Sequence, residues 1–571
     1  MRLSSGFWTV CDRKGEIMLL SKNGATGRRI QFTASIFTTA LLIVFVLIWQ
    51  GAAVARETVT EQLLDIMKAK HVISEREYKA LKKEAEEEKA ALNRQLEKSM
   101  EVRKAALARQ VREQIEEREK AQAAGMEAQV KAAQAKLESE NNPHGFHTVW
   151  RNGIVTESND GNFKMHVGGY GELDFGSMNG DAELRALARG VGAVANGYGA
   201  EVRRFRPTIT GTLWGNIDFQ AQMDFGGGTT RVTNVWARLN DIPFLGNVQI
   251  GHQKEPFSLE ELTSDEWTSF LERALPNTFA VGNTNGDYNT GVKIYNQELD
   301  KRMTWALGGF INQSNNSGSF YGNYANTDLV ARLTALPWYE DKGWDIVHIG
   351  FSYSYKDRKT SNPTLDYDSK PEFHVTNLYT LETGLIPTTG ANTFDPELGL
   401  GIGSFSLHAE YFNSMVGYDT RLSSNTVTNL AKTKINNPDF DGYYVQASYF
   451  LTGENRPYDL NEGIFTRPIP LCNYNWNTGG WGAWELVARF SNANLTSGGI
   501  TGGNENDVTA GINWYLNPNL KLQMNYIFAM LSDRTYVVQT GVAKGGAAIY
   551  GTKAINDADA NIIAMRMLFD F

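Results

Sequence analysis

Residues 561–571, NIIAMRMLFDF, end the chain in a segment that alternates strictly between two faces. In a strand, neighbouring side chains point to opposite faces of the sheet. One face carries only large apolar side chains: Ile563, Met565, Met567, Phe569 and Phe571. The other face carries Ala564, Arg566, Leu568 and Asp570. This pattern is typical of the closing strand of an outer-membrane β-barrel. A soluble edge strand also alternates, but it would need a core at the very terminus.

The chain upstream of this segment repeats the same alternation many times. From Asn162 onward it is rich in Gly, Tyr, Phe, Trp, Asn and Asp, and sixteen strands are predicted. Their ranges are 163–175, 201–214, 215–226, 230–240, 246–254, 290–298, 301–312, 326–338, 344–357, 371–384, 402–418, 439–454, 483–495, 505–517, 519–534 and 559–571. Residues 347–355 and 520–528 alternate most clearly, and the face with Tyr and Trp is interpreted as the lipid face.

The predicted connections also fit a barrel, in which tight periplasmic turns alternate with longer outer loops. The tight joins all follow even-numbered predicted strands, as periplasmic turns should: 214–215, 240–246, 341–343 and 517–519. The long segments follow odd-numbered strands, as outer loops should: 177–200, 255–289, 358–370, 419–438 and 535–558. Two joins are long although they follow even-numbered strands: 385–401 and 455–482. Sixteen strands predict a barrel wide enough to enclose water.

The N-terminus predicts export. Residues 32–49 form an uncharged apolar run after Arg28 and Arg29, and Ala53-Val54-Ala55 supplies small residues before a cleavage site. Residues 1–55 are therefore predicted to be a signal peptide. An uncleaved anchor helix is the alternative. Met18 is a more ordinary start, which leaves residues 1–17 open as a mis-assigned extension.

Residues 56–142 are predicted to form a long periplasmic helical arm, because they are rich in Ala, Glu, Lys, Gln and Arg and lack Pro. Ser74 and Glu77 have the spacing of a capping box. Apolar positions recur every eleven residues, which keeps a stripe nearly straight. A coiled-coil-like spacer and a solvated helix without a partner both remain open. Residues 143–162 are predicted to be a linker.

The composition argues against two classes of function. The chain has 55 basic and 64 acidic residues, a net charge of −9, and an acidic total disfavours nucleic-acid binding. It contains no GxSxG, HExxH or Walker motif, so an enzyme is not expected. No metal site or cofactor is expected either.

Several strings resemble the phosphate-selective porin O/P family. They are RRFRPTITGTLWGNIDFQAQMDF (203–225), NVQIGHQKEPFSLEELTSDEWTSFLERALPN (247–277), DGYYVQASYFLTGENRPYD (441–459), GGWGAWELVARFSNANL (479–495) and GINWYLNPNLKLQMNYI (511–527). The resemblance covers roughly 160–571 in order. It implies a trimer of sixteen-stranded barrels whose third outer loop and one periplasmic turn fold into the lumen. An inward turn explains the long join at 455–482.

The resemblance also implies pore residues. Arg203 and Arg204 match the paired arginines that contact anion at the family's constriction, and a guanidinium fork suits phosphate oxygens. Alternation places Arg204 and Arg206 on one face and Arg203 on the other, unless the pair lies at a bulge. Pairing of these arginines with Asp218 or Asp224 is the alternative. The predicted anion-binding set is completed by three residues: Lys254, Ser264 and Arg273.

The chain departs from the family's pattern in the loop string 263–267. Where the phosphate-selective members supply a Ser and a Lys to phosphate, this chain has Asp265 and Glu266. Two carboxylates repel phosphate if the loop folds inward in the same way. Further cations that could face the lumen are Lys293, Arg332, Arg456, Arg467 and Arg566.

These observations predict an all-β transmembrane barrel, residues 163–571, in the outer membrane of a Gram-negative cell, preceded by a helical arm. The expected function is passive diffusion of small polar or anionic solutes, with phosphate as one candidate. The alternatives are an outer-membrane anchor whose arm reaches the cell wall, and a non-selective or cation-tolerant porin. The expected partners are outer-membrane lipid, small anions, two further copies and the barrel-insertion machinery, which is expected to read Phe571.

Overall fold

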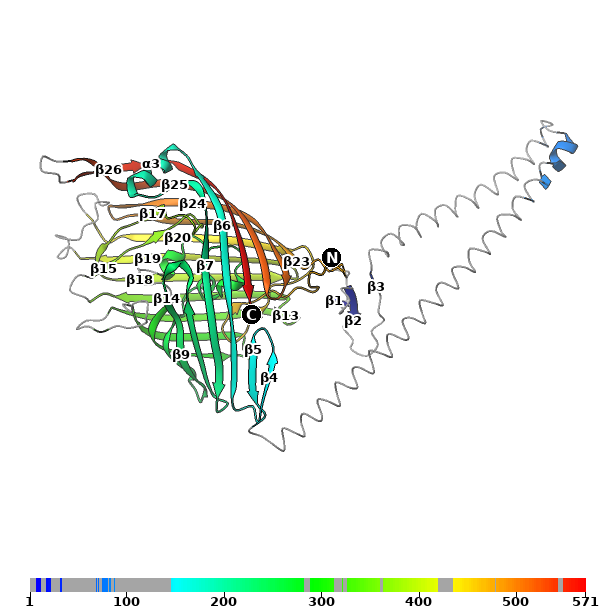
Figure 1. The fold of residues 1–571 in the computed structure, drawn as a ribbon, viewed down its shortest axis with the longest axis horizontal. Coiled ribbons are helices and arrows are strands. Elements are labelled where there is room, and N and C mark those ends of the chain that lie inside the picture. Colours follow the sequence, from blue (N-terminus) through cyan, green and yellow to red (C-terminus); the bar gives the residue numbers. More distant parts are fainter. Residues whose placement is uncertain are drawn as a thin grey trace. The chain divides into compact units, whose positions relative to one another are not determined.

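The computed structural model describes residues 145–571, apart from 282–287, 313–320, 322–325, 360–362, 420–434, 478 and 543–547, together with short pieces of the first 144 residues. Residues 146–571 belong to one of the chain's two compact units. Within the described part, sixteen long antiparallel strands close into a barrel (Figure 1). The predicted fold is therefore confirmed for the body of the chain.

The strands of the barrel wall follow one another in sequence. They are β6 (Lys164–Gly180), β7 (Asn196–Leu213), β8 (Ile217–Asp224), β9 (Arg231–Ile242), β10 (Gly246–Lys254), β11 (Tyr288–Glu298), β12 (Met303–Ile311), β13 (Thr327–Glu340), β14 (Asp345–Asp357), β18 (Ile386–Ile402), β19 (Phe405–Tyr418), β20 (Asp439–Phe450), β23 (Ala483–Ser497), β24 (Ile500–Asn517), β25 (Leu520–Val542) and β27 (Ala558–Asp570). β26 (Ala548–Ile555) extends β25 into an outer hairpin.

The first and last strands of the wall close the barrel. β27 pairs with β6 from Ala560 to Asp570, and Phe571 exchanges two backbone hydrogen bonds with Gly169, of 2.9 and 3.0 Å. At the start of β6, the strand edge is covered by a hairpin of β4 (Phe146–Trp150) and β5 (Ile154–Ser158), which pairs with residues 164–167. The segment predicted as a linker thus holds a hairpin that covers backbone groups the C-terminus does not reach.

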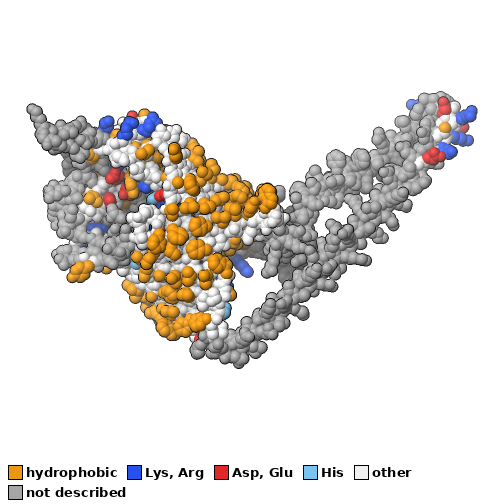
Figure 2. Space-filling model, in the orientation of Figure 1, with side chains coloured by type: hydrophobic (Ala, Val, Ile, Leu, Met, Phe, Trp, Pro, Cys, Tyr) orange, Lys and Arg blue, Asp and Glu red, His pale blue; other side chains and the backbone are white. Residues whose placement is uncertain are grey.

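The two faces of the wall differ as the alternation predicts. On β27 the outward Ile563 and Met565 are 42% and 46% exposed, whereas the inward Arg566 is 2% exposed. The same contrast holds for the outward Phe351 and the inward Ser352 on β14. Figure 2 shows hydrophobic side chains gathered over the outer wall, the arrangement expected of a surface that faces lipid.

One predicted strand was wrong. Residues 371–384 do not cross the membrane, and the strand lies instead at 386–402, as β18. β18 was missed because it carries Pro387 and Pro396, which cannot donate to a ladder and argue against a strand interior. Its pairing with β19 skips residues 395 and 396. The join to β19 is the tight turn 403–404, so the predicted long join at 385–401 does not exist.

Three connections fold against the inner face of the wall. The loop after β10 holds α4 (Leu259–Leu262), η2 (Asp265–Trp267) and α5 (Asn277–Val281). The connection after β14 holds β15 (Thr364–Leu365), β16 (Asp368–Ser369) and β17 (Leu381–Glu382). The turn after β20 holds β21 (Tyr458–Asp459) and β22 (Ile464–Phe465). Their apolar side chains build the buried clusters inside the barrel, such as Phe279 with Tyr367 and Ile464 with Leu336.

The turn after β20 is the inward turn that the resemblance implies. Arg332 of β13 donates to the carbonyl oxygens of Glu462 (3.1 Å) and Gly463 (3.0 Å). Phe465 stacks on His408 of β19, with ring centres 4.1 Å apart. Both contacts come from inward-facing wall residues, so the turn reaches into the lumen.

The remaining elements are short. The first outer loop carries α3 (Ala182–Val191), and η1 (Gly226–Gly228) follows β8. Near the N-terminus lie β1 (Phe7–Cys11), β2 (Ile17–Ser21) and β3 (Gln31–Phe32). In the arm, Ser74 and Glu77 form the predicted capping box, with the Ser74 N–H donating to Glu77 at 2.9 Å. The apolar run 33–49 and most of the arm lie outside the described residues. No described helix is long and apolar enough to cross a membrane.

Candidate functional site

The predicted arginine pair lies on β7 at a β-bulge. β7 pairs with β6 through Arg204 and Glu172, but the next pair joins Val202 to Leu173, so Arg203 is the extra residue. A bulge places two consecutive side chains toward the same side of a sheet. Arg203, Arg204 and Arg206 therefore all point inward, which settles the alternative left open by the alternation.

Arg204 and Arg206 are buried in ion pairs. Arg204 lies 2.6 Å from Glu172 and 3.1 Å from Asp265. Arg206 lies 2.7 Å from Asp224 and 2.8 Å from Asp265. The predicted alternative partner Asp224 is thus confirmed, whereas Asp218 pairs with Arg238 instead, at 2.5 Å.

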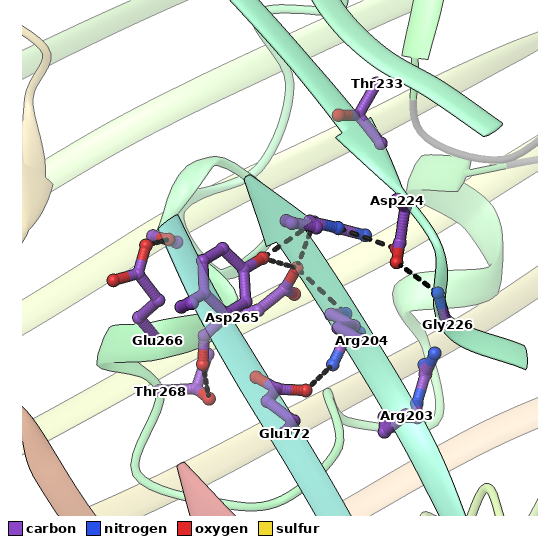
Figure 3. Close-up of polar contacts among 12 residues, drawn as sticks. Glu172, Arg203, Arg204, Asp224, Gly226, Thr233, Asp265, Glu266 and Thr268 are labelled. Carbon is purple, nitrogen blue, oxygen red and sulfur yellow. Dashed lines mark hydrogen bonds and ion pairs between the residues drawn. The ribbon is translucent and has the colours of Figure 1, made fainter. Parts of the chain in front are cut away.

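The loop after β10 brings the acidic partner to these arginines. Ser258 caps α4, and its hydroxyl accepts from the Glu261 N–H at 3.1 Å. The Arg273 side chain stabilises the loop by donating hydrogen bonds to the carbonyl oxygens of Glu260 (3.1 Å) and Thr263 (2.9 Å) within it. This fixed loop holds Asp265 against the wall, as Figure 3 shows for its contact with Arg204.

Asp265 is the centre of the cluster. Its carboxylate lies within 3.1 Å of Arg204, 2.8 Å of Arg206 and 2.5 Å of Arg273. Burial acts to raise the pKa of Asp265, but the charges of Arg204, Arg273 and Arg206 outweigh it and hold the pKa well below its usual range. A fixed negative charge therefore sits where three guanidinium groups converge.

Glu266, the next residue, has a different environment. Figure 3 shows it on the loop beside Asp265, and its carboxylate lies 3.1 Å from Arg467 of the inward turn. Ser264 donates to Glu266 at 3.3 Å and does not join the arginine cluster. Burial raises the pKa of Glu266 to about 7, against the opposing charge of Arg467.

The cluster contains as many acidic as basic groups. Its cations are the predicted Arg203, Arg204, Arg206, Lys254 and Arg273, joined by Arg566. Its carboxylates are Glu172, Asp174, Asp224, Glu261, Asp265 and Glu272. Six charges of each sign cancel, so the cluster offers little net field to a passing ion.

Some residues of the cluster were not predicted. The alternation of β6 places Tyr170, Glu172 and Asp174 on one inward face, a signal that could have identified them. Tyr170 and Tyr288 hydroxyls accept from Arg206 at 2.9 and 3.2 Å. Glu272 pairs with Arg203 at 2.8 Å, and no spacing in the sequence predicts this contact.

The other predicted lumen cations are also engaged. Arg332 pairs with Glu397 at 2.7 Å, and Arg456 pairs with Glu485 at 2.5 Å. Lys293 instead places its ammonium 4.9 Å from the centre of the Tyr295 ring. These side chains therefore do not form a ladder of unpaired cations along the part of the lumen that the structure describes.

The chain is similar to several known proteins. A family model described as phosphate-selective porin O and P matches residues 173–571. An uncharacterized protein of Caulobacter vibrioides is 25% identical over 389 residues, covering 66% of this chain and 70% of that protein. Porin O of Pseudomonas aeruginosa is 22% identical over 414 residues, covering 66% of this chain and 86% of that protein. Among solved structures, an anion-selective porin from Comamonas acidovorans has a TM-score of 0.41 at 12% identity, covering 71% of this chain and 100% of that chain.

Proposed function

The chain belongs to the phosphate-selective porin O and P family of outer-membrane porins. On this premise, we propose that it forms a channel that does not prefer phosphate, unlike the porins for which the family is named. Small polar solutes and ions of either sign diffuse passively through it. The lumen supplies size exclusion and fixed dipoles, and it carries out no chemistry on the solute.

The observation that carries this proposal is the position of Asp265 between three arginines. A bound phosphate would need those same guanidinium groups, because bidentate Arg contacts are what favour phosphate oxygens. The carboxylate, which is part of the loop, already accepts hydrogen bonds from Arg206 and Arg273 and forms an ion pair with Arg204 at 3.1 Å. A tethered group competes at an effective concentration of about millimolar or more. Phosphate at lower concentrations therefore does not displace it.

The balance of charges in the cluster supports weak selectivity as well. Anion selectivity requires fixed cations whose charge is not cancelled at the narrowest point. Arg203 is matched by Glu272, Arg204 by Glu172, and Arg206 by Asp224. Once these pairs form, Asp265 and Arg273 remain as a further matched pair.

Reversal potentials in planar bilayers test this proposal. With a tenfold potassium chloride gradient, an ideally selective channel gives about 59 mV. The native porin is expected to give less than about half of that limit. An Asp265→Asn variant is expected to shift the potential toward anion preference. A native potential close to the anion limit would overturn the proposal.

The homotrimer implied by the family resemblance belongs to the same proposal. β7 pairs with β8 only from Thr208 to Leu213, so the wall is short at β8. A hollow of about 590 Å³ lies there, lined by Glu201, Val202, Phe205, Phe225, Gly227 and Gly228. Uncovered backbone groups are costly in lipid, which favours covering by another copy.

Light scattering of the porin in detergent tests the trimer. The native protein is expected at three chains, and Phe225→Ser is expected to weaken the assembly. Phe351→Ser, an outward residue of β14, is the matched control and should stay trimeric. A native monomer would contradict this part of the proposal.

The N-terminal regions extend the proposal. Residues 1–55 are a signal peptide, residues 56–142 are a periplasmic arm, and Phe571 is read by the insertion machinery. Sequencing of the mature protein is expected to begin at Arg56. Deletion of 57–140 is expected to leave conductance unchanged, and a loss of conductance would contradict a spacer role.

A further inference from the structure

The Arg467 side chain joins three separate parts of the barrel's periplasmic end. Arg467 lies on the inward turn, two residues after β22, and its side chain is 21% exposed. Nη2 of its guanidinium lies 3.1 Å from the carboxylate of Glu266, on the loop after β10, and also contacts Asp570 of β27. Nη1 donates to the side-chain oxygen of Asn152 at 3.0 Å. One cation therefore links the loop, the closing strand and the turn of the hairpin β4–β5.

The hairpin turn that carries Asn152 is fixed against the barrel. Asn152 adopts a left-handed backbone conformation, with a φ of +53°. Nε2 of His166 on β6 lies 2.7 Å from its carbonyl oxygen. Asn519, in the turn between β24 and β25, donates to the same side-chain oxygen that accepts from Arg467. The hairpin thus holds a defined acceptor in front of Arg467.

This contact connects a part of the chain outside the family match with the loop that carries Asp265. The hairpin spans residues 146–158, whereas the family model matches residues 173–571. In the sequence, the hairpin follows the predicted arm, residues 56–142. Arg467 therefore lies between an N-terminal element and the acidic loop string that departs from the family's pattern.

Glu266 is the group of this loop that depends on Arg467. Burial raises the pKa of Glu266 to about 7, the charge of Arg467 opposes this rise, and the charges of Asp570 and Glu172 add to it. Among the described residues, no other cation forms an ion pair with the Glu266 carboxylate. Displacing Arg467 therefore raises the pH at which Glu266 ionises.

Two further polar groups lie beside Glu266 without replacing Arg467. The Ser264 hydroxyl donates to its carboxylate at 3.3 Å and carries no charge. The Lys521 ammonium of β25 donates to the carbonyl oxygens of Glu266, at 2.8 Å, and of Thr268, at 3.1 Å. Neither group forms an ion pair with the carboxylate.

The contact with Asn152 determines how the guanidinium divides its donors. A guanidinium fork binds one carboxylate best through two parallel N–H groups. Because Asn152 occupies Nη1, Nη2 is shared between Glu266 and Asp570. Without Asn152, the fork is able to turn toward Asp570 and to bind it with both groups. Glu266 then loses its cation.

We propose that Arg467 is a positioning residue that sets the charge of Glu266 in the channel, and that the hairpin β4–β5 holds Arg467 in place. Its effect on passing ions rests on the proposed open channel. With the hairpin docked, the negative charge of Glu266 is stabilised at neutral pH. When the hairpin moves, Glu266 takes up a proton and the cation preference of the channel falls. The hairpin is thereby a regulatory element of selectivity.

The pH dependence of the reversal potential tests the role of Arg467, on the full-length porin in planar bilayers under a potassium chloride gradient. The cation preference of the native channel is expected to rise with a midpoint near pH 7, where Glu266 ionises. Arg467→Met is expected to raise this midpoint by about 1–3 pH units, the effect of a neighbouring cation on a carboxyl group. A role in folding alone would not move the midpoint of the channels that do form.

Asn152→Gly isolates the contribution of the hairpin. Gly adopts a positive φ without strain, so the substitution removes the acceptor of Arg467 and keeps the turn. The midpoint is expected to rise, by less than in Arg467→Met. Leu299→Gly is the matched control, because Leu299 is also an uncharged turn residue with a φ of +53° and is exposed. It should keep the native midpoint.

Three results would overturn the inference. They are a native potential that does not change with pH, equal midpoints in the native porin and Arg467→Met, and a midpoint in Asn152→Gly that equals that of Leu299→Gly. The proposed function fails on a different result, a native potential close to the anion limit, so the two failures are distinguishable.

Discussion

Replacing Arg566 by Met is expected to destabilise the closure of the barrel. Arg566 lies on β27 and is fully buried. It holds Asp174 of β6 through two contacts of 2.7 Å, and it lies 2.8 Å from Glu272 and 3.3 Å from Glu172. Met fills a similar volume, so the main loss is the positive charge.

The size of the expected loss of stability depends on which carboxylates keep an ion-pair partner. Glu172 keeps Arg204, and Glu272 keeps Arg203. Asp174 loses its only ion-pair partner among the described residues. Breaking one buried ion pair in this way costs about 3–5 kcal/mol. Removing the orphaned charge as well, in Arg566→Met with Asp174→Asn, is expected to recover at least half of that loss.

Urea unfolding of the barrel in lipid vesicles, followed by the gel mobility of the folded form, measures these free energies. Arg302→Met is the matched control, because Arg302 is exposed and a surface substitution changes stability by about 0.5 kcal/mol or less. A loss below about 1 kcal/mol for Arg566→Met would contradict the cost expected for an orphaned buried carboxylate. A double variant less stable than Arg566→Met would refute it too.

Three further perturbations have expected outcomes. The pKa of Glu266 is about 7, above its usual value, so raising the pH from 5 to 8 adds a negative charge to the loop. Cation preference in bilayers should therefore rise with pH in the native porin but not in Glu266→Gln, and an equal rise in both would contradict this. Arg332→Met removes the bonds to Glu462 and Gly463, each worth about 1.5–3 kcal/mol. The released turn should increase single-channel conductance, and unchanged conductance would show that another contact holds it. Deleting 146–158 uncovers the edge of β6, so the yield of folded porin in vesicles should fall, whereas an unchanged yield would show that the hairpin is dispensable.

The alternation of apolar and polar residues was sufficient to predict most strands of the barrel wall. Ile563 and Arg566 on β27 fall on the predicted faces, because a strand between lipid and lumen must alternate. The segment 371–384 shows where this reasoning fails. Its Phe373, Leu378 and Leu381 are buried, but against the inner clusters of the barrel. Periodicity indicates burial without saying what covers the residue.

The pairing of charges could not be predicted in the same way. Arg206 and Asp265 are 59 positions apart, and Arg566 and Asp174 are 392 apart. Such contacts depend on strand register and on the path of a folded loop. The bulge that turns Arg203 inward is a further case, because it shifts the register by one residue without a mark in the sequence.

On the proposed function, Asp265 takes the place of an anion among the arginines. The most direct test is a phosphate titration of the chloride current through single channels of native porin and Asp265→Asn, side by side. The native current is expected to be insensitive to phosphate up to about millimolar concentrations, the effective concentration of the tethered carboxylate. The variant is expected to be blocked at lower phosphate. Block of the native channel at the same low concentrations as the variant would contradict the claim.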